Sequence, residues 1–431
     1  MFYRGSTAVI APDLMRDLRL SPESIGVLTG AFFLAFAVMQ IPCGLLFDRF
    51  GPRRTVPSLL TLAAIGSLVF ASAQGMAGLT AGRVLMGLGS AGVLMGSLVV
   101  AARWFPLDRY ALIASLLIAT GGTGNLLATA PLAAAVEAIG WRGAFVGAAV
   151  VTGLLCLLGY AAVRDAPPGH PYHERESVSF GEVLRGMREV LANRQLPFIF
   201  AANFVTYASV MTVIGLWGGP YLHDVYGLDG VGRGKVLLLM ATAVIAGALV
   251  YGPLDRLFDT RKFVILGGGG AKLVVLSVLA LTPGLELWQV TSLFMLLGVF
   301  GGYGVVIMAH GRAIFPERLM GRGITTLNVA VMTGVATMQV ATGAIIGAFT
   351  PSPGSPAPVE AYRLTFGFLV LVELFALAIY SRVNDAKPSR DARARERTER
   401  PIPRRGGCSG TANRAFSSSR ETPKSTQEDP E

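Results

Sequence analysis

The chain has 431 residues, of which 52% are apolar and 15% are charged, and its formal net charge is +10 at pH 7. Together with abundant glycine, this composition is typical of a helical protein with several membrane spans rather than of a large water-soluble core. Much of the basic charge lies in short segments between apolar runs and in the region after residue 383, so it does not indicate a nucleic-acid partner.

The sequence gives no indication of a disulfide, a metal centre, a signal peptide or an enzyme site. Cys43 and Cys156 lie inside apolar runs and Cys408 lies in a polar region, so the sequence implies neither a disulfide nor a metal centre. No basic segment followed by a short apolar core and a cleavage site opens the chain, and we expect no cleaved signal peptide. The sequence carries no catalytic pair or metal-ligand spacing, so we predict no enzyme activity and no cofactor.

The first apolar segment, residues 1–13, is too short to cross a bilayer. A helix of that length would span roughly 18 Å, against about 30 Å for the hydrocarbon layer. We therefore expect a half-length first helix, which a start codon assigned too far downstream or a fragmentary chain would explain. The first explanation predicts an in-frame apolar extension in the upstream DNA, and a stop codon directly before Met1 would refute it.

Eleven longer apolar runs follow, each long enough for a membrane helix. The first five are residues 25–47, 56–73, 79–102, 107–132 and 141–163. The last six are residues 196–222, 236–254, 263–281, 287–309, 324–349 and 364–380. Between the two groups lies a polar linker, residues 164–195, in which an amphipathic segment, residues 179–192, is expected to lie along the membrane surface. Residues 383–431 are rich in Arg, Ser and Pro and are predicted to be a disordered tail.

A charged loop separates the second and third membrane segments, and it reads Gly44-Leu-Leu-Phe-Asp-Arg-Phe-Gly-Pro-Arg-Arg54. Gly44 permits close approach to a neighbouring helix, and Gly51-Pro52 is a turn signal. The pattern resembles the signature loop of the major facilitator superfamily of secondary transporters, with matches at Gly44, Leu46, Asp48, Arg49, Gly51, Arg53 and Arg54. A general excess of basic residues in cytoplasmic loops would explain the arginines, but neither the glycine spacing nor Asp48.

Three features of the first half recur in the same order in the second. Phe105-Pro-Leu-Asp-Arg109 has a counterpart in Phe315-Pro-Glu-Arg318, and Trp141-Arg142 has one in Tyr362-Arg363. The signature loop returns in degenerate form as Gly252–Lys262, which supplies Asp255, Arg256 and Arg261. The repeat predicts two homologous six-helix halves, residues 1–163 and 196–382. The resemblance therefore implies an all-α, polytopic fold of two pseudo-symmetric six-helix bundles, with the two loops gating its cytoplasmic mouth.

The basic residues also predict the orientation. The loops between helices two and three, four and five, eight and nine, and ten and eleven carry more Lys and Arg than the opposite loops. We therefore expect both termini and the linker to be cytoplasmic, in a protein of the inner (cytoplasmic) membrane.

Arg4 is the first candidate for substrate binding, because an ionisable side chain near the centre of a span costs about 2.5 to 3.5 kcal/mol and is retained for a reason. In the resembling family the first helix of each half lines the central cavity, so Arg4, with Tyr3 beside it, is predicted to face an anionic substrate. The alternative is an arginine that snorkels or pairs for structural reasons.

Arg83, in Gly82-Arg-Val-Leu-Met-Gly-Leu-Gly-Ser90, resembles the fourth-helix motif of the superfamily. The resemblance implies a role for Arg83 in proton coupling, whereas Gly87 and Gly89 are explained by close helix packing.

Other polar residues in the spans are weaker candidates for the site. Asn125 follows a glycine-rich stretch similar to that of nitrate and nitrite carriers, although Leu126 and Leu127 replace the glycines expected there. Asn203, Tyr207 and Trp217 lie along the seventh helix and could line the opposite wall. We predict structural pairing or lipid-interface placement for Lys272 and Glu373, and a solvated loop position for His310.

The resulting hypothesis is a secondary active transporter, monomeric and embedded in the lipid bilayer, that moves a small organic solute by alternating access. An anionic solute is favoured by Arg4. The chain lacks a nucleotide-binding loop, so an ion gradient, most simply of protons, is expected to drive it. No carboxylate lies mid-span in the first half, which leaves uniport or exchange open. The remaining alternatives are multidrug efflux, although the Gly-x-x-x-Gly-Pro pattern is missing, and a sensor that no longer transports.

Overall fold

The computed structural model describes residues 1–167, 180–316, 319–352 and 355–389. Within these ranges it leaves undescribed the side chains of Asp48, Leu107, Asp108, Tyr110, Ala111, Ser115, Phe180 and residues 182–184. All the described residues belong to one compact unit, Met1–Asp391. The predicted tail beyond residue 389 and part of the predicted linker lie outside the described residues, and the domain boundaries at residues 163 and 195 stay predictions.

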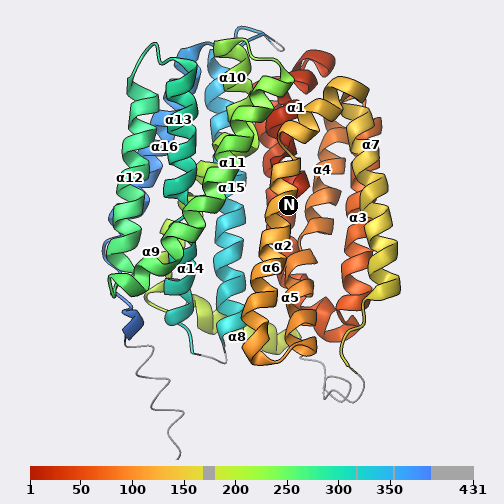
Figure 1. The fold of residues 1–431 in the computed structure, drawn as a ribbon, viewed down its shortest axis with the longest axis vertical. Helices are drawn as coiled ribbons and strands as arrows, with labels where there is room; N and C mark the ends of the chain where they lie inside the picture. The colour runs from red at the N-terminus through yellow and green to blue at the C-terminus, as the bar shows by residue number, and fades with distance from the viewer. Residues whose placement is uncertain (168–179, 317–318, 353–354, 390–431) are drawn as a thin grey trace, which may run out of the picture. The chain divides into compact units, whose positions relative to one another are not determined.

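The described part of Met1–Asp391 is helical throughout (Figure 1). The helices up to the linker are α1 (Phe2–Leu18), α2 (Pro22–Phe50), α3 (Pro52–Ser72), α4 (Met76–Ser90), α5 (Val93–Trp104), α6 (Leu107–Leu127) and α7 (Ala130–Ala162). The helices from the linker onward are α8 (Phe180–Leu191), α9 (Leu196–Thr212), α10 (Gly218–Tyr226), α11 (Gly230–Leu257), α12 (Lys262–Leu281), α13 (Leu287–Gly301), α14 (Gly304–Ala313), α15 (Met320–Phe349) and α16 (Val359–Tyr380). A π-helical turn, Val213–Trp217, joins α9 to α10.

Ten helical stretches in the described residues are long and apolar enough to cross a membrane. Three of them are continuous spans built from two consecutive helices, namely Met76–Trp104, Leu196–Tyr226 and Leu287–Ala313. Each break contains a glycine, at Gly92 in Met76–Trp104, Gly215 in Leu196–Tyr226 and Gly302 in Leu287–Ala313, and Gly92 and Gly302 are matching positions of the repeat. The structure therefore confirms the all-α polytopic fold.

Two helix boundaries differ from the prediction. The first helix was expected to end at Asp13, but it contains Pro12 without a break and runs on to Leu18, for 17 residues in all. Arg19, in a left-handed conformation with φ 49°, caps it. Polar residues at a helix end face solvent without breaking the helix, which is why composition alone placed the end too early. The fifth apolar run, residues 107–132, is not one helix, because α6 ends at Leu127 and α7 begins at Ala130. Within α7, a turn at Gly140 with φ 72° separates residues 130–139 from the segment that begins at Trp141.

The two halves of the chain, α1–α7 and α9–α16, contact each other most extensively through α2 and α15 (Figure 1). Glycines bring these backbones together, since a Cβ atom on Gly26 would lie 2.5 Å from the carbonyl oxygen of Gln339. We call the end of the helices that carries Gly51 and Asp259 the signature end, and the end that carries Asp13 and Arg233 the opposite end.

Candidate functional site

A cavity of about 1120 Å³ lies between the two halves. Its walls come from α1, α2 and α4–α7 on one side and from α9, α11 and α13–α15 on the other. Thr325 lines it close to the start of α15, at the signature end of that helix, and Ser97 and Leu98 line it near the middle of α5. The cavity therefore extends from the middle of the helices toward that end.

Arg4 is the one charged side chain among the described residues that line this cavity. Its guanidinium carbon lies 4.4 Å from the centre of the Phe36 ring on α2, a geometry in which the ring face stabilises the cation. Its NH1 group donates to the sulfur of Met1 at 3.7 Å, and none of the ion pairs in the described region includes Arg4. The guanidinium therefore lies on the wall with unused donors, and its role in binding stays a prediction.

Three other predicted site residues also line the cavity. Tyr3 is 8% exposed, and its hydroxyl lies 3.0 Å from that of Thr152. Asn203 and Tyr207 line the opposite wall on α9, where the Asn203 amide donates to the Leu327 carbonyl at 2.8 Å. The structure thus brings Tyr3 and Arg4 together with Asn203 and Tyr207 around one space.

Two amide side chains that line the cavity were not among the predicted site residues. Gln40 of α2 donates to the Ala91 carbonyl at 3.2 Å, and Asn328 of α15 lines the wall that belongs to the second half. Each is an amide side chain inside an apolar run, the same signal that singled out Asn203. Rotation about the helix axis decides which such amides reach the cavity, and sequence does not define that rotation.

Two weaker candidates lie elsewhere. Asn125 is not among the described residues that line the cavity, although its neighbour Gly124 is. Trp217 is 2% exposed, and its indole N–H donates to the Thr342 hydroxyl at 2.9 Å. The expectation that Trp217 lines the cavity wall was therefore wrong, because the π-helical turn points this side chain toward α15.

Arg83 of α4 is fully buried behind the cavity wall. Its NH1 group donates to the Tyr3 carbonyl at 2.8 Å and its NH2 group donates to the Thr7 hydroxyl, both on α1. Its guanidinium carbon lies 5.0 Å from the centre of the Phe70 ring, and its Nε atom has no hydrogen-bond partner. Arg83 therefore supports the backbone next to Arg4, and its predicted part in proton coupling stays a prediction.

Lys272 of α12 and Glu373 of α16 form an ion pair inside the second half, with 2.9 Å between Nζ and Oε2. Their side chains are 0% and 1% exposed. The ammonium also donates to the Thr206 carbonyl and the Ser209 hydroxyl, and the Tyr303 hydroxyl donates to Glu373 at 2.6 Å. Of the two predicted alternatives, the structure shows pairing rather than a lipid-interface position.

The sequence model of the Major Facilitator Superfamily matches residues 1–311. The chain belongs to the Major Facilitator Superfamily. It is accordingly a multi-pass membrane protein of a family whose matched relatives are named as transporters, not enzymes.

Relatives within the superfamily are distant. The nitrate/nitrite transporter NrtP of Picosynechococcus sp. is 30% identical over 262 residues, which cover 53% of this chain and 46% of that protein. The "Probable L-galactonate transporter" of Escherichia coli is 26% identical over 270 residues, which cover 58% of this chain and 57% of that protein. The chain thus spans about half the length of these relatives.

Solved superfamily structures share the fold. A bacterial homologue of the human lysosomal transporter Spinster, in an inward-facing and occupied conformation, superposes with a TM-score of 0.73 at 19% sequence identity, over 88% of this chain and 92% of that one. A D-xylose-proton symporter gives a TM-score of 0.67 at 14% identity, over 89% and 95% of the two chains.

Most of the predicted signature loop is helical: residues 44–50 end α2 and residues 52–54 begin α3, so only Gly51 lies between the two helices. Gly51 has φ 74°, and the Arg53 N–H donates to the Asp165 carboxylate at 2.7 Å. A Cβ atom at Gly51 would lie 2.6 Å from that carboxylate, so both the turn and the contact require glycine. Gly44 was expected to permit close helix approach, but a Cβ atom there would meet nothing within 4 Å. The side chain of Asp48 lies outside the described part of the structure, and exposed side chains in this loop include Arg49, Arg53 and Arg54.

The degenerate loop of the second half is held in a similar way. Asp259 occupies the position of Gly51 with φ 47°, and the Arg261 Nε donates to the Asp255 carboxylate at 3.3 Å, while the side chain of Arg256 is exposed. Asp385, which follows α16 as Asp165 follows α7, accepts the Arg261 N–H at 3.1 Å. Each half therefore ends in an aspartate that caps the backbone of its own loop.

Asp385 lies outside the membrane spans. Burial on its own would raise the pKa of its carboxyl group, but the hydroxyl of Thr260 and the backbone N–H groups of Lys262 and Arg261 donate to the charged form, and the pKa is lowered overall. The cap therefore stays ionised at neutral pH.

The predicted position of His310 was wrong. It was expected in a solvated loop, but it lies in α14 with 0% exposure. Its Nδ1 atom is 2.6 Å from the Tyr380 hydroxyl and its Nε2 atom is 3.1 Å from the Asn384 carbonyl. The segment after α16 covers this position, a tertiary contact that the flanking polar sequence did not reveal.

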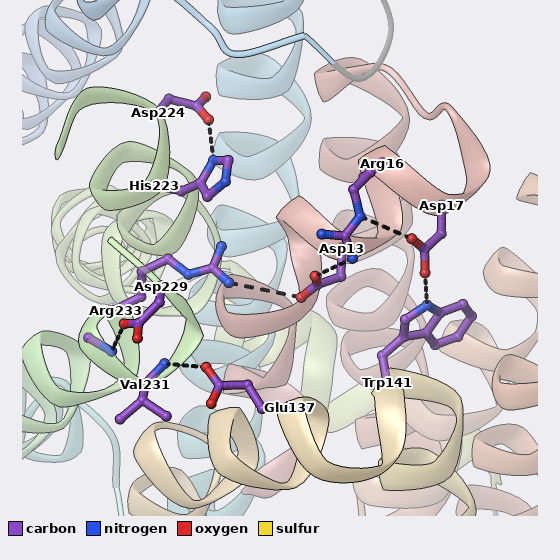
Figure 2. Close-up of polar contacts among 11 residues, drawn as sticks. Asp13, Arg16, Asp17, Glu137, Trp141, His223, Asp224, Asp229, Val231 and Arg233 are labelled. Carbon is purple, nitrogen blue, oxygen red and sulfur yellow. Dashed lines mark hydrogen bonds and ion pairs between the residues drawn. The ribbon is translucent and has the colours of Figure 1, made fainter. Parts of the chain in front are cut away.

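At the opposite end, charged groups link the two halves (Figure 2). Arg233 of α11 pairs with Asp13 of α1 at 3.9 Å, and the Val231 N–H donates to Glu137 of α7 at 3.1 Å. Arg233 is only 4% exposed. Asp13 also pairs with Arg16 of its own helix at 3.0 Å.

Backbone packing closes the same region beneath these charges. A Cβ atom on Gly219 of α10 would lie 1.7 Å from the Ala8 carbonyl oxygen of α1, so the two halves meet without an intervening side chain. The halves are thus in direct contact at the opposite end, while the cavity extends from the middle of the helices toward the signature end.

Proposed function

We propose that the protein is a secondary transporter that carries a small organic anion across the cytoplasmic membrane by alternating access, and that Arg4 binds the anion. The observation that carries this proposal is that Arg4 is the one charged side chain among the described residues of the central cavity. The names of two relatives support it, because nitrate, nitrite and L-galactonate are anions. Arg83, buried behind Tyr3 without an ion-pair partner in the described residues, adds positive potential beside the same wall.

The basic loops support an orientation in which the signature end and both termini face the cytoplasm. In that orientation the cavity is open inward and the Asp13–Arg233 region is the closed outer gate. Inversion would separate the halves at this gate and close the signature end, where Arg49, Arg53 and Arg54 of the first loop and Asp255, Arg256 and Arg261 of the second are the gating residues. The protein acts as a monomer in this proposal, because one chain contributes both walls of the site.

Substitution of Arg4 tests the proposal. In liposomes loaded with purified protein, Arg4→Gln is expected to lower uptake of labelled nitrate, tartrate or benzoate, whichever the wild type carries, by about tenfold or more, since hydrogen bonds to a charged group contribute about 1.5 to 3 kcal/mol. Arg16→Gln is the matched control, because Arg16 lies on the same helix with a side chain that is 72% exposed. Unchanged uptake by Arg4→Gln would reject the assigned role.

The driving force is proposed to be a proton gradient, with Arg83 as the coupling residue. Anion exchange is the second candidate, favoured because the described cavity lining contains no Asp or Glu. Proton coupling predicts that an imposed inward proton gradient speeds uptake several-fold in empty liposomes. Exchange predicts instead that uptake requires anion inside the liposomes and that its rate does not change with the proton gradient.

A further inference from the structure

The cavity around Arg4 is apolar to an extent that the charge alone does not explain. Leu94, Leu98, Leu117 and Leu155 line the first half, and Val305 and Met308 line the second. The Phe36 ring lies against the Arg4 guanidinium itself. A site for a small, fully hydrated anion has no use for these surfaces, because an ion gains nothing from apolar contact that offsets the loss of its water.

Several hydroxyl groups on the walls are bonded to the protein backbone. Ser97 donates to the Val93 carbonyl at 2.9 Å, Thr120 to Leu116 at 2.8 Å and Thr325 to Gly321 at 3.0 Å. Each acceptor lies four residues earlier on the same helix, so these donors do not point into the cavity. A substrate with several hydroxyl groups would lose its hydrogen bonds to water here and regain few of them.

Two of the three amide side chains in the described lining also donate to the backbone, and Asn328 is the third. The Gln40 amide nitrogen donates to the Ala91 carbonyl and that of Asn203 to the Leu327 carbonyl. The described lining offers a ligand one charged group, the Arg4 guanidinium, and a few neutral polar groups such as Asn328 and Tyr207, on a wall that is otherwise largely hydrocarbon, in a volume of about 1120 Å³. Pockets for drug-sized ligands occupy about 300 to 1,000 Å³, so the space suits an organic body rather than nitrate.

We infer that the substrate is an amphipathic organic monoanion, with one carboxylate or sulfonate group on an aliphatic or aromatic body. The acidic group binds Arg4, and the body lies between Phe36 and the leucine-rich wall. This inference rests on the proposed function, because it takes Arg4 as the anion site. It departs from the solutes for which the relatives are named, nitrate, nitrite and L-galactonate, which are small or rich in hydroxyl groups.

A series of carboxylates tests the inference by calorimetric binding to the purified protein in detergent. From acetate through butyrate to hexanoate, the dissociation constant is expected to fall roughly fourfold for each added CH₂ group. Phenylacetate is expected to bind at least as tightly as hexanoate, and nitrate and tartrate much more weakly. Tighter binding of laurate than of phenylacetate would indicate a substrate derived from the membrane, and tighter binding of phenylacetate would indicate a water-soluble one.

Two controls remove non-specific uptake into micelles. Hexanamide has the same body without the charge, and Arg4→Gln has the same cavity without the guanidinium; both are expected to lose most of the binding. If the variant is not recovered, the hexanamide comparison on the wild type is sufficient. Chain-length dependence that persists equally in hexanamide would reflect partitioning and would overturn the inference.

Different results would reject the anion site and the amphipathic substrate. If nitrate or tartrate binds as tightly as hexanoate, in a manner that depends on Arg4, the proposed function stands and the amphipathic substrate is rejected. If none of the anions binds more tightly to the wild type than to Arg4→Gln, the anion site itself is rejected.

Discussion

Glu373→Gln is expected to lower the free energy of unfolding by about 3 to 5 kcal/mol, because it leaves the Lys272 ammonium buried without a counter-charge. The two side chains are 0% and 1% exposed, so water cannot replace the lost partner. The Tyr303 hydroxyl, which donates to the carboxylate at 2.6 Å, would also lose its charged acceptor. Reversible unfolding of the purified protein in mixed micelles measures the change.

The double variant Lys272→Met/Glu373→Gln separates charge from packing. With both charges removed, the loss is expected to be much smaller than for Glu373→Gln alone, since a buried ion pair and a neutral pair of similar volume differ little in stability. Glu360→Gln, an exposed position at the start of the same helix, is the control and should change stability by about 0.5 kcal/mol or less. Losses that simply add in the double variant would show that the two residues act independently.

Arg233→Gln is expected to open the opposite end of the protein more often. Arg233 and Asp13 belong to different halves and pair at 3.9 Å, so removal of the guanidinium withdraws an attraction that exists only when the halves meet (Figure 2). A change of about 1.4 kcal/mol corresponds to a tenfold shift in population. An Ala8→Cys reporter, at a residue that is 0% exposed when the halves are in contact, should react about tenfold faster with a membrane-impermeant maleimide.

Matched variants identify the origin of such a change. Arg16→Gln removes a charge from the same cluster, but the Arg16 pairs with Asp13 and Asp17 stay within α1, so the reporter should react at the wild-type rate. Gly219→Ala tests the packing independently, because its added methyl group would clash with the Ala8 carbonyl and should also speed labelling. Gly270→Ala, where an added Cβ meets nothing within 4 Å, should have no effect. Equal rates in Arg233→Gln and the wild type would remove Arg233 from the gate.

Features that depend on a single helix or a single turn could be predicted from the sequence. Runs of apolar residues of sufficient length specify spans, because a bilayer accepts only segments whose backbone hydrogen bonds are internal. The turn at Gly51 followed from its neighbours, because a positive φ is a local requirement. The internal repeat and the signature loop were sufficient to identify the superfamily. Arg4 was found because a charge inside a span is rare.

Only the tertiary structure decided which side chains meet. Lys272 and Glu373 are about a hundred residues apart, and nothing local to either indicates the 2.9 Å contact. His310 was misplaced because the segment after α16 covers it. Trp217 was misplaced, and Asn125 is not among the described residues that line the cavity, because each position depends on how a helix is rotated about its axis. That rotation is determined by the packing of neighbouring helices, to which distant parts of the chain contribute, whereas the length and polarity of a span are properties of the span itself.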